Sequence, residues 1–106
     1  MSEPGDVPPS VVFDPAAREE LAEAVAYYDQ QRPALGDEFL AEVKRTVARI
    51  REFPTAWPQV SRRSRRCRVT RFPHGLVYQK TVDVIRILAV AHLRRRPRYW
   101  RGREQP

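Results

Sequence analysis

The chain has 106 residues, enough for one small domain with a modest core. Its one cysteine, Cys67, excludes an internal disulfide, and no metal-ligand spacing surrounds it. No apolar run is long enough to span a membrane, the N-terminus lacks the basic and apolar regions of a signal peptide, and no phosphate-binding glycine loop is present. We therefore expect a cytoplasmic protein with no membrane partner, no metal and no cofactor.

The charge is divided unevenly between the two halves of the chain. Residues 1–53 carry eleven acidic and six basic side chains, a net charge of −5, whereas residues 54–106 carry two acidic and 14 basic side chains, a net charge of +12. Of the 20 basic residues 18 are arginine, whose forked guanidinium suits phosphate and carboxylate groups. We expect the second half to bind an anionic partner, although a compositional bias of the genome would also produce this excess.

The first half of the chain predicts a helical hairpin. Residues 1–9 contain three prolines and are expected to be a disordered lead-in, and residues 10–13 read as a possible edge strand. Asp14 and Pro15 form a helix start, which predicts a helix over 15–31. A second helix is expected over 34–52, with an apolar stripe formed by Leu35, Phe39, Val43, Val47 and Ile50.

The second half predicts strands. From Arg65 the apolar period becomes two, and a turn at Pro73–Gly75 places His74 as a turn residue. Leu76–Gln79 and Val84–His92 follow as strands, the latter apolar on both faces and therefore central. The expected fold is α+β, a helical hairpin packed on a small, three- to four-stranded antiparallel sheet. It forms a single domain over residues 10–101, and residues 102–106 are expected to be a flexible C-terminus.

Several short motifs resemble one family when they are taken together. They are Tyr28, Leu35-Gly36, Phe39, the Arg71-Phe72-Pro73 corner, and Ala89-Val90-x-His92 followed by Pro97-x-Tyr99-Trp100. Over residues 11–101 the chain resembles the RelE/ParE superfamily of toxins from type II toxin–antitoxin modules, and is most similar to the ParE branch. The family fold, a helical hairpin on an antiparallel sheet, agrees with the periodicity.

The resemblance implies a growth-inhibiting toxin that a cognate antitoxin neutralises through its acidic C-terminal segment, in a toxin–antitoxin hetero-oligomer. ParE-type members act on DNA gyrase, and RelE-type members cut mRNA on the ribosome. Both targets are compatible with a basic half. A third possibility is a non-toxic member that only binds an antitoxin and regulates the operon.

A cluster of five arginines precedes the predicted sheet: Arg62, Arg63, Arg65, Arg66 and Arg68. Such a cluster would bind phosphates or an acidic antitoxin segment. The alternative is a solvated loop and edge strand, whose charges block edge-to-edge pairing. Arg86 lies alone on the apolar central strand, where it either binds a carboxylate or phosphate of a partner or, as we slightly favour, pairs with an acid such as Asp83 or one from the helices.

The segment after the last strand carries the other candidates. Its arginines and aromatic residues, Arg94, Arg96, Arg98 and Trp100, are expected to contact the antitoxin or the target. A nuclease would instead use His92, Tyr99 and Arg95 as base, acid and cation, but this is a weak candidate set. The lysine pair of RelE-type nucleases has no match here, and Leu93 stands where some of them carry an arginine. In the alternative interpretation His92 caps the strand and Tyr99-Trp100 folds back as a hydrophobic closure.

Overall fold

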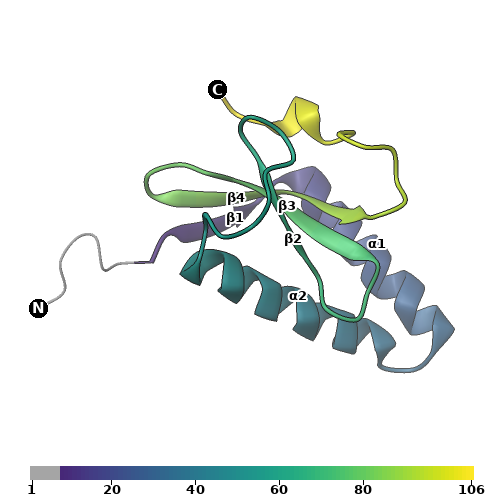
Figure 1. The fold of residues 1–106 in the computed structure, drawn as a ribbon. Coiled ribbons are helices and arrows are strands. Elements are labelled where there is room, and N and C mark those ends of the chain that lie inside the picture. The colour runs from purple at the N-terminus through teal and green to yellow at the C-terminus, as the bar shows by residue number, and fades with distance from the viewer. Residues whose placement is uncertain (1–7) are drawn as a thin grey trace, which may run out of the picture.

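A computed structural model describes residues 8–106, so most of the expected lead-in lies outside the described residues. Two helices cover one face of a four-stranded sheet, and the C-terminal segment covers part of the other face (Figure 1). The elements are β1 (Ser10–Phe13), α1 (Pro15–Gln31), α2 (Leu35–Glu52), β2 (Arg65–Arg68), β3 (His74–Lys80), β4 (Val84–His92) and the short 3-10 helix η2 (Arg101–Arg103).

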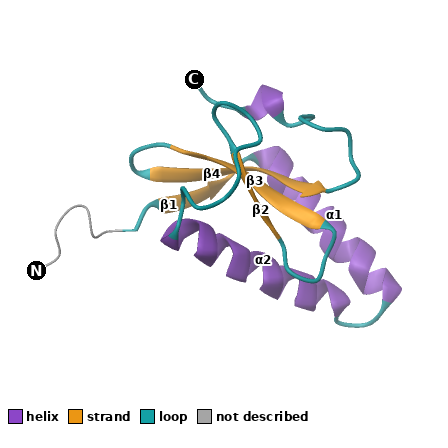
Figure 2. Ribbon diagram, viewed as in Figure 1, coloured by secondary structure: helices purple, strands orange, loops and turns teal. Residues whose placement is uncertain are grey.

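The sheet has the strand order β1-β4-β3-β2, which makes β4 a central strand as its apolar sequence predicts (Figure 2). The β2–β3 and β3–β4 pairs are antiparallel, whereas β1 pairs with β4 in parallel, from Ser10 opposite Val84 to Phe13 opposite Ile87. The fold class is therefore confirmed, except that the edge strand makes the sheet mixed. β1 leads directly into α1, so the chain returns to the sheet only after the helical hairpin.

The helical hairpin forms where the sequence predicts it. Asp14 begins α1, because its Oδ1 accepts a hydrogen bond from the Ala16 N–H at 2.9 Å and Pro15 fits the first turn. At the start of α2, a Cβ on Gly36 would lie 2.6 Å from the Val25 carbonyl oxygen of α1. Only glycine permits this close approach of the two helices.

The core has two parts, one on each face of the sheet. On the helix side, Ile85, Ile87 and Val90 of β4 join the main core around Phe39 and Ile50. On the other side, Leu88, Ala89 and Ala91 form a second, smaller core with Val77 and Trp100. A β-bulge lets Leu88 and Ala89 join the same core: Val77 lies opposite Ala89 and Tyr78 opposite Ile87, so Leu88 has no counterpart on β3.

The structure corrects the expectation for His74. It is not a turn residue but the first residue of β3, where it is only 7% exposed and pairs with His92 on β4. The turn lies earlier, at Arg71, whose backbone is left-handed with φ 74°. At the C-terminus, residues 103–105 hydrogen-bond to the rest of the domain as described below.

Among residues 8–106 there is no helix with both the length and the apolar character that crossing a membrane requires.

Candidate functional site

The C-terminal segment, residues 93–106, folds back over the second core. Arg98 has a left-handed backbone with φ 62°, and this turn directs the chain back toward the sheet. Trp100 is then 4% exposed and packs with Val77, Leu88 and Ala89. Trp100 therefore folds back as a hydrophobic closure, as in the alternative interpretation of the sequence. Little of the Trp100 ring is left for contact with a partner.

One salt bridge fixes the segment to the edge of β4. β1 ends opposite Ile87, so the backbone of Leu88 and Val90 has no strand beside it on that side. Glu20 of α1 accepts a hydrogen bond from the Val90 N–H at 3.0 Å, and Arg103 donates one to the Leu88 carbonyl at 2.9 Å. Arg103 and Glu20 are themselves paired at 3.0 Å. The two side chains thus form the hydrogen bonds with the β4 backbone that a neighbouring strand would otherwise form.

The last residues are held by polar contacts with β3 and the loop before β2. The Glu104 carboxylate accepts hydrogen bonds from the hydroxyls of Ser61 and Ser64. Gln79 of β3 binds the backbone of Gln105 twice, donating to its carbonyl at 2.6 Å and accepting from its N–H at 2.8 Å. The arginines between residues 94 and 101 therefore lie on a segment that is fixed at both ends.

A groove between the C-terminal segment and the sheet brings the two predicted arginine clusters together. It has a volume of about 370 Å³, and Arg66 of β2 lines it together with Arg95, Arg96 and Arg98. His92 also lines it, and among residues 8–106 no acidic side chain does. We call this the arginine groove. Its charge makes it suited to carboxylate or phosphate groups.

The other members of the Arg62–Arg68 cluster lie elsewhere. Arg62, Arg63 and Arg65 line a second cavity, of about 480 Å³, beside Tyr78 and Lys80. Arg65 is held there by a hydrogen bond to the Trp57 carbonyl at 2.7 Å, and Arg63 donates one to the Gln105 carbonyl at 3.2 Å. Arg68 is exposed near Arg49 and Thr70. The five arginines therefore surround the β2 edge and do not form one site.

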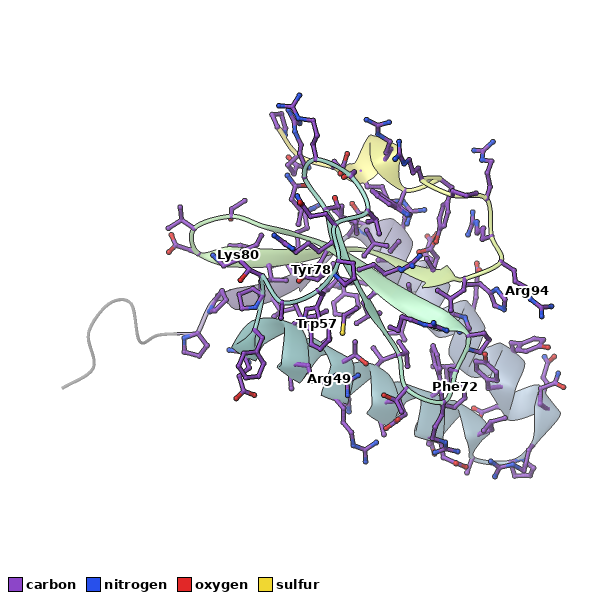
Figure 3. The ribbon with its side chains drawn as sticks, viewed as in Figure 1. Arg49, Trp57, Phe72, Tyr78, Lys80 and Arg94 are labelled. Atoms are coloured by element: carbon purple, nitrogen blue, oxygen red, sulfur yellow. The ribbon has the colours of Figure 1, made fainter. Side chains whose placement is uncertain are left out.

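The exposed arginines of the C-terminal segment differ in how they are held. Arg94 projects outward from the turn after β4 (Figure 3). Arg95 stacks on the Tyr99 ring, 3.7 Å from its centroid, and pairs with Glu20 at 3.2 Å. Among the described residues Arg94, Arg96 and Arg98 have no salt bridge to an acidic side chain, so their charges are available to a partner.

Arg86 makes a structural pair, the interpretation that we slightly favoured. Its partner is Asp14, at 3.3 Å, and not Asp83. Asp14 also begins α1, so the pair joins the central strand to the start of the helix.

His92 and Tyr99 are poorly placed for acid–base catalysis. His92 Nδ1 accepts a hydrogen bond from the Arg94 N–H at 3.0 Å and so closes the turn after β4. Burial and the neighbouring Glu20 carboxylate raise the pKa of Tyr99 to about 12. Its hydroxyl is buried, and the guanidinium groups of Arg95 and Arg103 lie over its ring. A phenol with this pKa is a weak acid near neutral pH.

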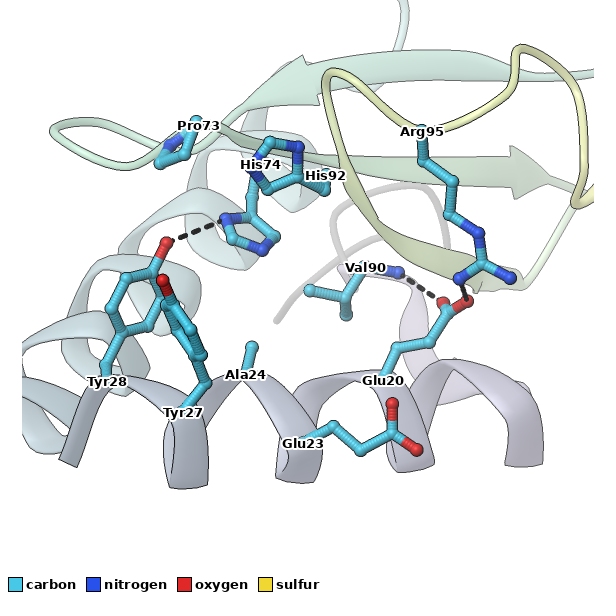
Figure 4. Close-up of a pocket in the computed structure, with 10 residues that line it drawn as sticks. All are labelled: Glu20, Glu23, Ala24, Tyr27, Tyr28, Pro73, His74, Val90, His92 and Arg95. Carbon is cyan, nitrogen blue, oxygen red and sulfur yellow. Dashed lines mark hydrogen bonds and ion pairs between the residues drawn. The ribbon is translucent and has the colours of Figure 1, made fainter. Parts of the chain in front are cut away.

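A third cavity, which the sequence did not predict, lies beside His92 between α1 and the end of β4 and has a volume of about 540 Å³ (Figure 4). We call it the α1 pocket. Tyr27 and Tyr28 rise from α1 on one side, and His74 lies opposite, with its Nδ1 3.4 Å from the Tyr28 hydroxyl. Burial, together with the charge of His92, lowers the pKa of His74 to about 4. The spacing of Glu20, Glu23 and Tyr27 on one helix face was the signal that could have found this pocket.

Neither the arginine groove nor the α1 pocket offers a metal site among the described residues. In the part of the chain that the structure describes, no group of three or more histidine, cysteine, aspartate or glutamate side chains is arranged to hold a metal ion. The side chains that line the arginine groove and the α1 pocket are suited to bind charged and aromatic groups of a partner.

Comparisons with known proteins agree with this fold. The family model described as the ParE toxin of the type II toxin–antitoxin system parDE matches residues 11–97. A solved structure, the chromosomal ParDE toxin–antitoxin system from P. aeruginosa, is similar with a TM-score of 0.70 and 15% sequence identity. That match covers 79% of this chain and 95% of the other, and at this identity it shows the fold alone. No curated protein sequence matches the chain.

The family model spans most of the described domain, including both helices, all four strands and the first arginines of the C-terminal segment. The chain therefore belongs to the ParE toxin family of type II toxin–antitoxin systems.

Proposed function

We propose that this ParE-family toxin arrests growth by binding DNA gyrase through its C-terminal segment, without catalysis by the toxin. The observation that carries the proposal is the presentation of Arg94, Arg96 and Arg98. These side chains are exposed, lack acidic partners among the described residues, and lie on a segment that Trp100 and Arg103 fix to the domain. A preorganised set of arginines loses little conformational entropy when it binds an anionic surface.

The antitoxin is the second partner. We propose that its acidic C-terminal segment lies in the arginine groove, which Arg66, Arg96 and Arg98 line and to which no acidic side chain of the described residues contributes. Occupation of this groove would also cover arginines that the target needs. Neutralisation then follows from competition for one surface, and the toxin and antitoxin form a hetero-oligomer.

Induced expression, with and without the neighbouring antitoxin frame, tests the proposal. Gyrase inhibition predicts filamentation and DNA damage, and rescue when the antitoxin is co-expressed. Loss of translation would point instead to the ribosome and mRNA. Expression of the lone chain without growth arrest would favour the third possibility, a non-toxic regulator that binds the antitoxin.

The endoribonuclease alternative has less support. It needs Tyr99 to give up a proton, whereas burial and Glu20 raise the pKa of that hydroxyl to about 12. It also needs His92 to be free for proton transfer, and the Nδ1 of His92 already accepts the Arg94 N–H.

A further inference from the structure

The α1 pocket has a different chemistry from the arginine groove, although the two are neighbours. His92 and Arg95 line both cavities and so form the ridge between them. On the groove side the remaining charged side chains are arginines, whereas on the other side they are Glu20 and Glu23 of α1 (Figure 4). A peptide that crosses this ridge passes from a groove lined by arginines to a pocket that also contains acidic side chains.

On the α1 side of the pocket, Glu23 has no partner among residues 8–106, and the nearby ring of Tyr27 is exposed. Glu20 is fully engaged, because it accepts from the Val90 N–H and pairs with Arg95 and Arg103. Glu23 is exposed and makes no salt bridge or hydrogen bond with any residue in 8–106. One helical turn further, Tyr27 is 56% exposed, with its ring packed edge-on against Tyr28. The ring and the Glu23 carboxylate therefore border the same opening.

The opposite wall holds His74 and Arg95. His74 is neutral there, since burial lowers its pKa to about 4. The guanidinium of Arg95 pairs at 3.2 Å with Glu20, a carboxylate that it shares with Arg103. Glu23 is thus the acid of the pocket that pairs with no cation among residues 8–106, in a protein whose formal net charge is +7.

We propose that the α1 pocket receives a lysine or arginine side chain of the antitoxin. A cation in this position would pair with Glu23 and lie against the Tyr27 ring, and the two contacts reinforce each other. The inference rests on the proposed function in one respect, namely that an antitoxin segment occupies the arginine groove. We infer that this antitoxin segment places acidic residues in the arginine groove. Beyond the His92–Arg95 ridge, the same segment places a basic residue in the α1 pocket.

The first test uses the toxin alone with N-acetyl-arginine amide as the probe, followed by NMR. We expect saturable shifts of the Glu23 and Tyr27 signals, with a dissociation constant on the order of 1–10 mM. Glu23→Gln and Tyr27→Ala should weaken binding at least about threefold, whereas Tyr27→Phe, which keeps the ring, should not. The matched control is Glu19→Gln, which removes an exposed acid of the same helix that does not line the pocket. Equal binding to wild type and Glu23→Gln, or equal shifts with N-acetyl-norleucine amide, would overturn the inference.

The second test uses the antitoxin encoded beside the toxin gene and measures its affinity by calorimetry. We expect Glu23→Gln to weaken the complex about three- to tenfold relative to Glu19→Gln. If the two variants bind equally well, the inference is wrong and the proposed function stands. If the antitoxin fails to bind even the wild-type toxin, the proposed function fails, and the proposal of an antitoxin side chain fails with it.

Discussion

Arg103 Nη1 lies 3.0 Å from Glu20 Oε1, although the two residues are 83 positions apart in the chain. Both side chains also bind the β4 backbone beyond the end of β1. The pair therefore joins three parts of the molecule: the first helix, the central strand and the segment that presents the arginines. It explains how a segment with little secondary structure of its own holds a defined shape.

Removing either partner of this pair should destabilise the fold. Glu20→Gln leaves Arg103 without its counter-charge, and Arg103→Met leaves Glu20 and the Leu88 carbonyl with fewer partners. Because the two side chains are only 10% and 20% exposed, we expect a loss of about 2 kcal/mol in the free energy of unfolding. Urea denaturation measures it, with Arg101→Met at an exposed arginine as the control. Equal stability of Arg103→Met and Arg101→Met would show that the pair is unimportant.

Trp100→Ala should remove the main apolar contact of the C-terminal segment. The side chain is 4% exposed in the second core, so its loss is expected to lower stability by about 3 kcal/mol. Val82→Ala is the control, because Val82 is 88% exposed and should change stability by less than about 0.5 kcal/mol. A Trp100→Ala variant as stable as Val82→Ala would contradict the fold-back of residues 93–106.

His74 should make the stability depend on pH. In the unfolded chain its pKa is near 6.5, whereas burial lowers the folded value to about 4. The unfolded state then binds the proton first as the pH falls, so this contribution to stability is complete above about pH 6.5 and is lost toward pH 4. We expect a loss on the order of 2–3 kcal/mol.

The comparison of His74→Phe with His92→Gln isolates that effect. His74→Phe keeps an aromatic ring beside Phe39 and Tyr28 and should flatten the pH profile between 6.5 and 4, where the unfolded and folded pKa values lie. His92→Gln should largely retain the profile, because the charge of His92 is the smaller cause of the shift. If His74→Phe follows the wild-type profile, His74 is not the titrating group.

A double change, His92→Gln with Tyr99→Phe, separates the gyrase proposal from the nuclease alternative. The Tyr99 hydroxyl is buried and has no hydrogen-bond partner in the part of the chain that the structure describes, so its removal should cost little stability. We expect growth arrest on induction to remain at the wild-type level. Loss of arrest in a variant that remains folded by circular dichroism would support catalysis by these two residues.

The elements of the fold could be predicted from the sequence because their signals are local. Asp14-Pro15 predicts the start of α1, and the apolar run of Val84–His92 predicts a central strand. The parallel pairing of β1 could not be predicted, because it depends on where the helical hairpin returns the chain. The turn at Arg71 was also misplaced, since a left-handed arginine carries no sequence signal comparable to that of glycine.

Only the positive charge of the candidate site could be predicted from the sequence. The arginine excess identifies the basic half, but proximity in the sequence does not show that Arg66 meets Arg96 and Arg98 while Arg62 and Arg65 line another cavity. That division follows from the alternation of side chains along β2 and from the fold-back at Arg98. The Glu20–Arg103 pair was missed for the same reason, since nothing in the local pattern links the first helix to the last turn.

Charge reversal in the arginine groove should weaken antitoxin binding. Arg66→Glu combined with Arg96→Glu places two carboxylates where acidic side chains of the antitoxin would lie. We expect at least a tenfold loss of affinity at low salt, and a shallower salt dependence. The control is Lys44→Glu, which reverses an exposed charge on α2 that does not line the groove. Unchanged affinity at low ionic strength would exclude the groove as the antitoxin site.

The most direct test of the central claim is a DNA supercoiling assay with purified gyrase. The account predicts that the wild-type toxin inhibits supercoiling, and that changing Arg94, Arg96 and Arg98 together to glutamate abolishes inhibition without unfolding the protein. Addition of the antitoxin should restore supercoiling. Undiminished gyrase activity in the presence of excess folded toxin would contradict the account, as would full inhibition by the triple variant.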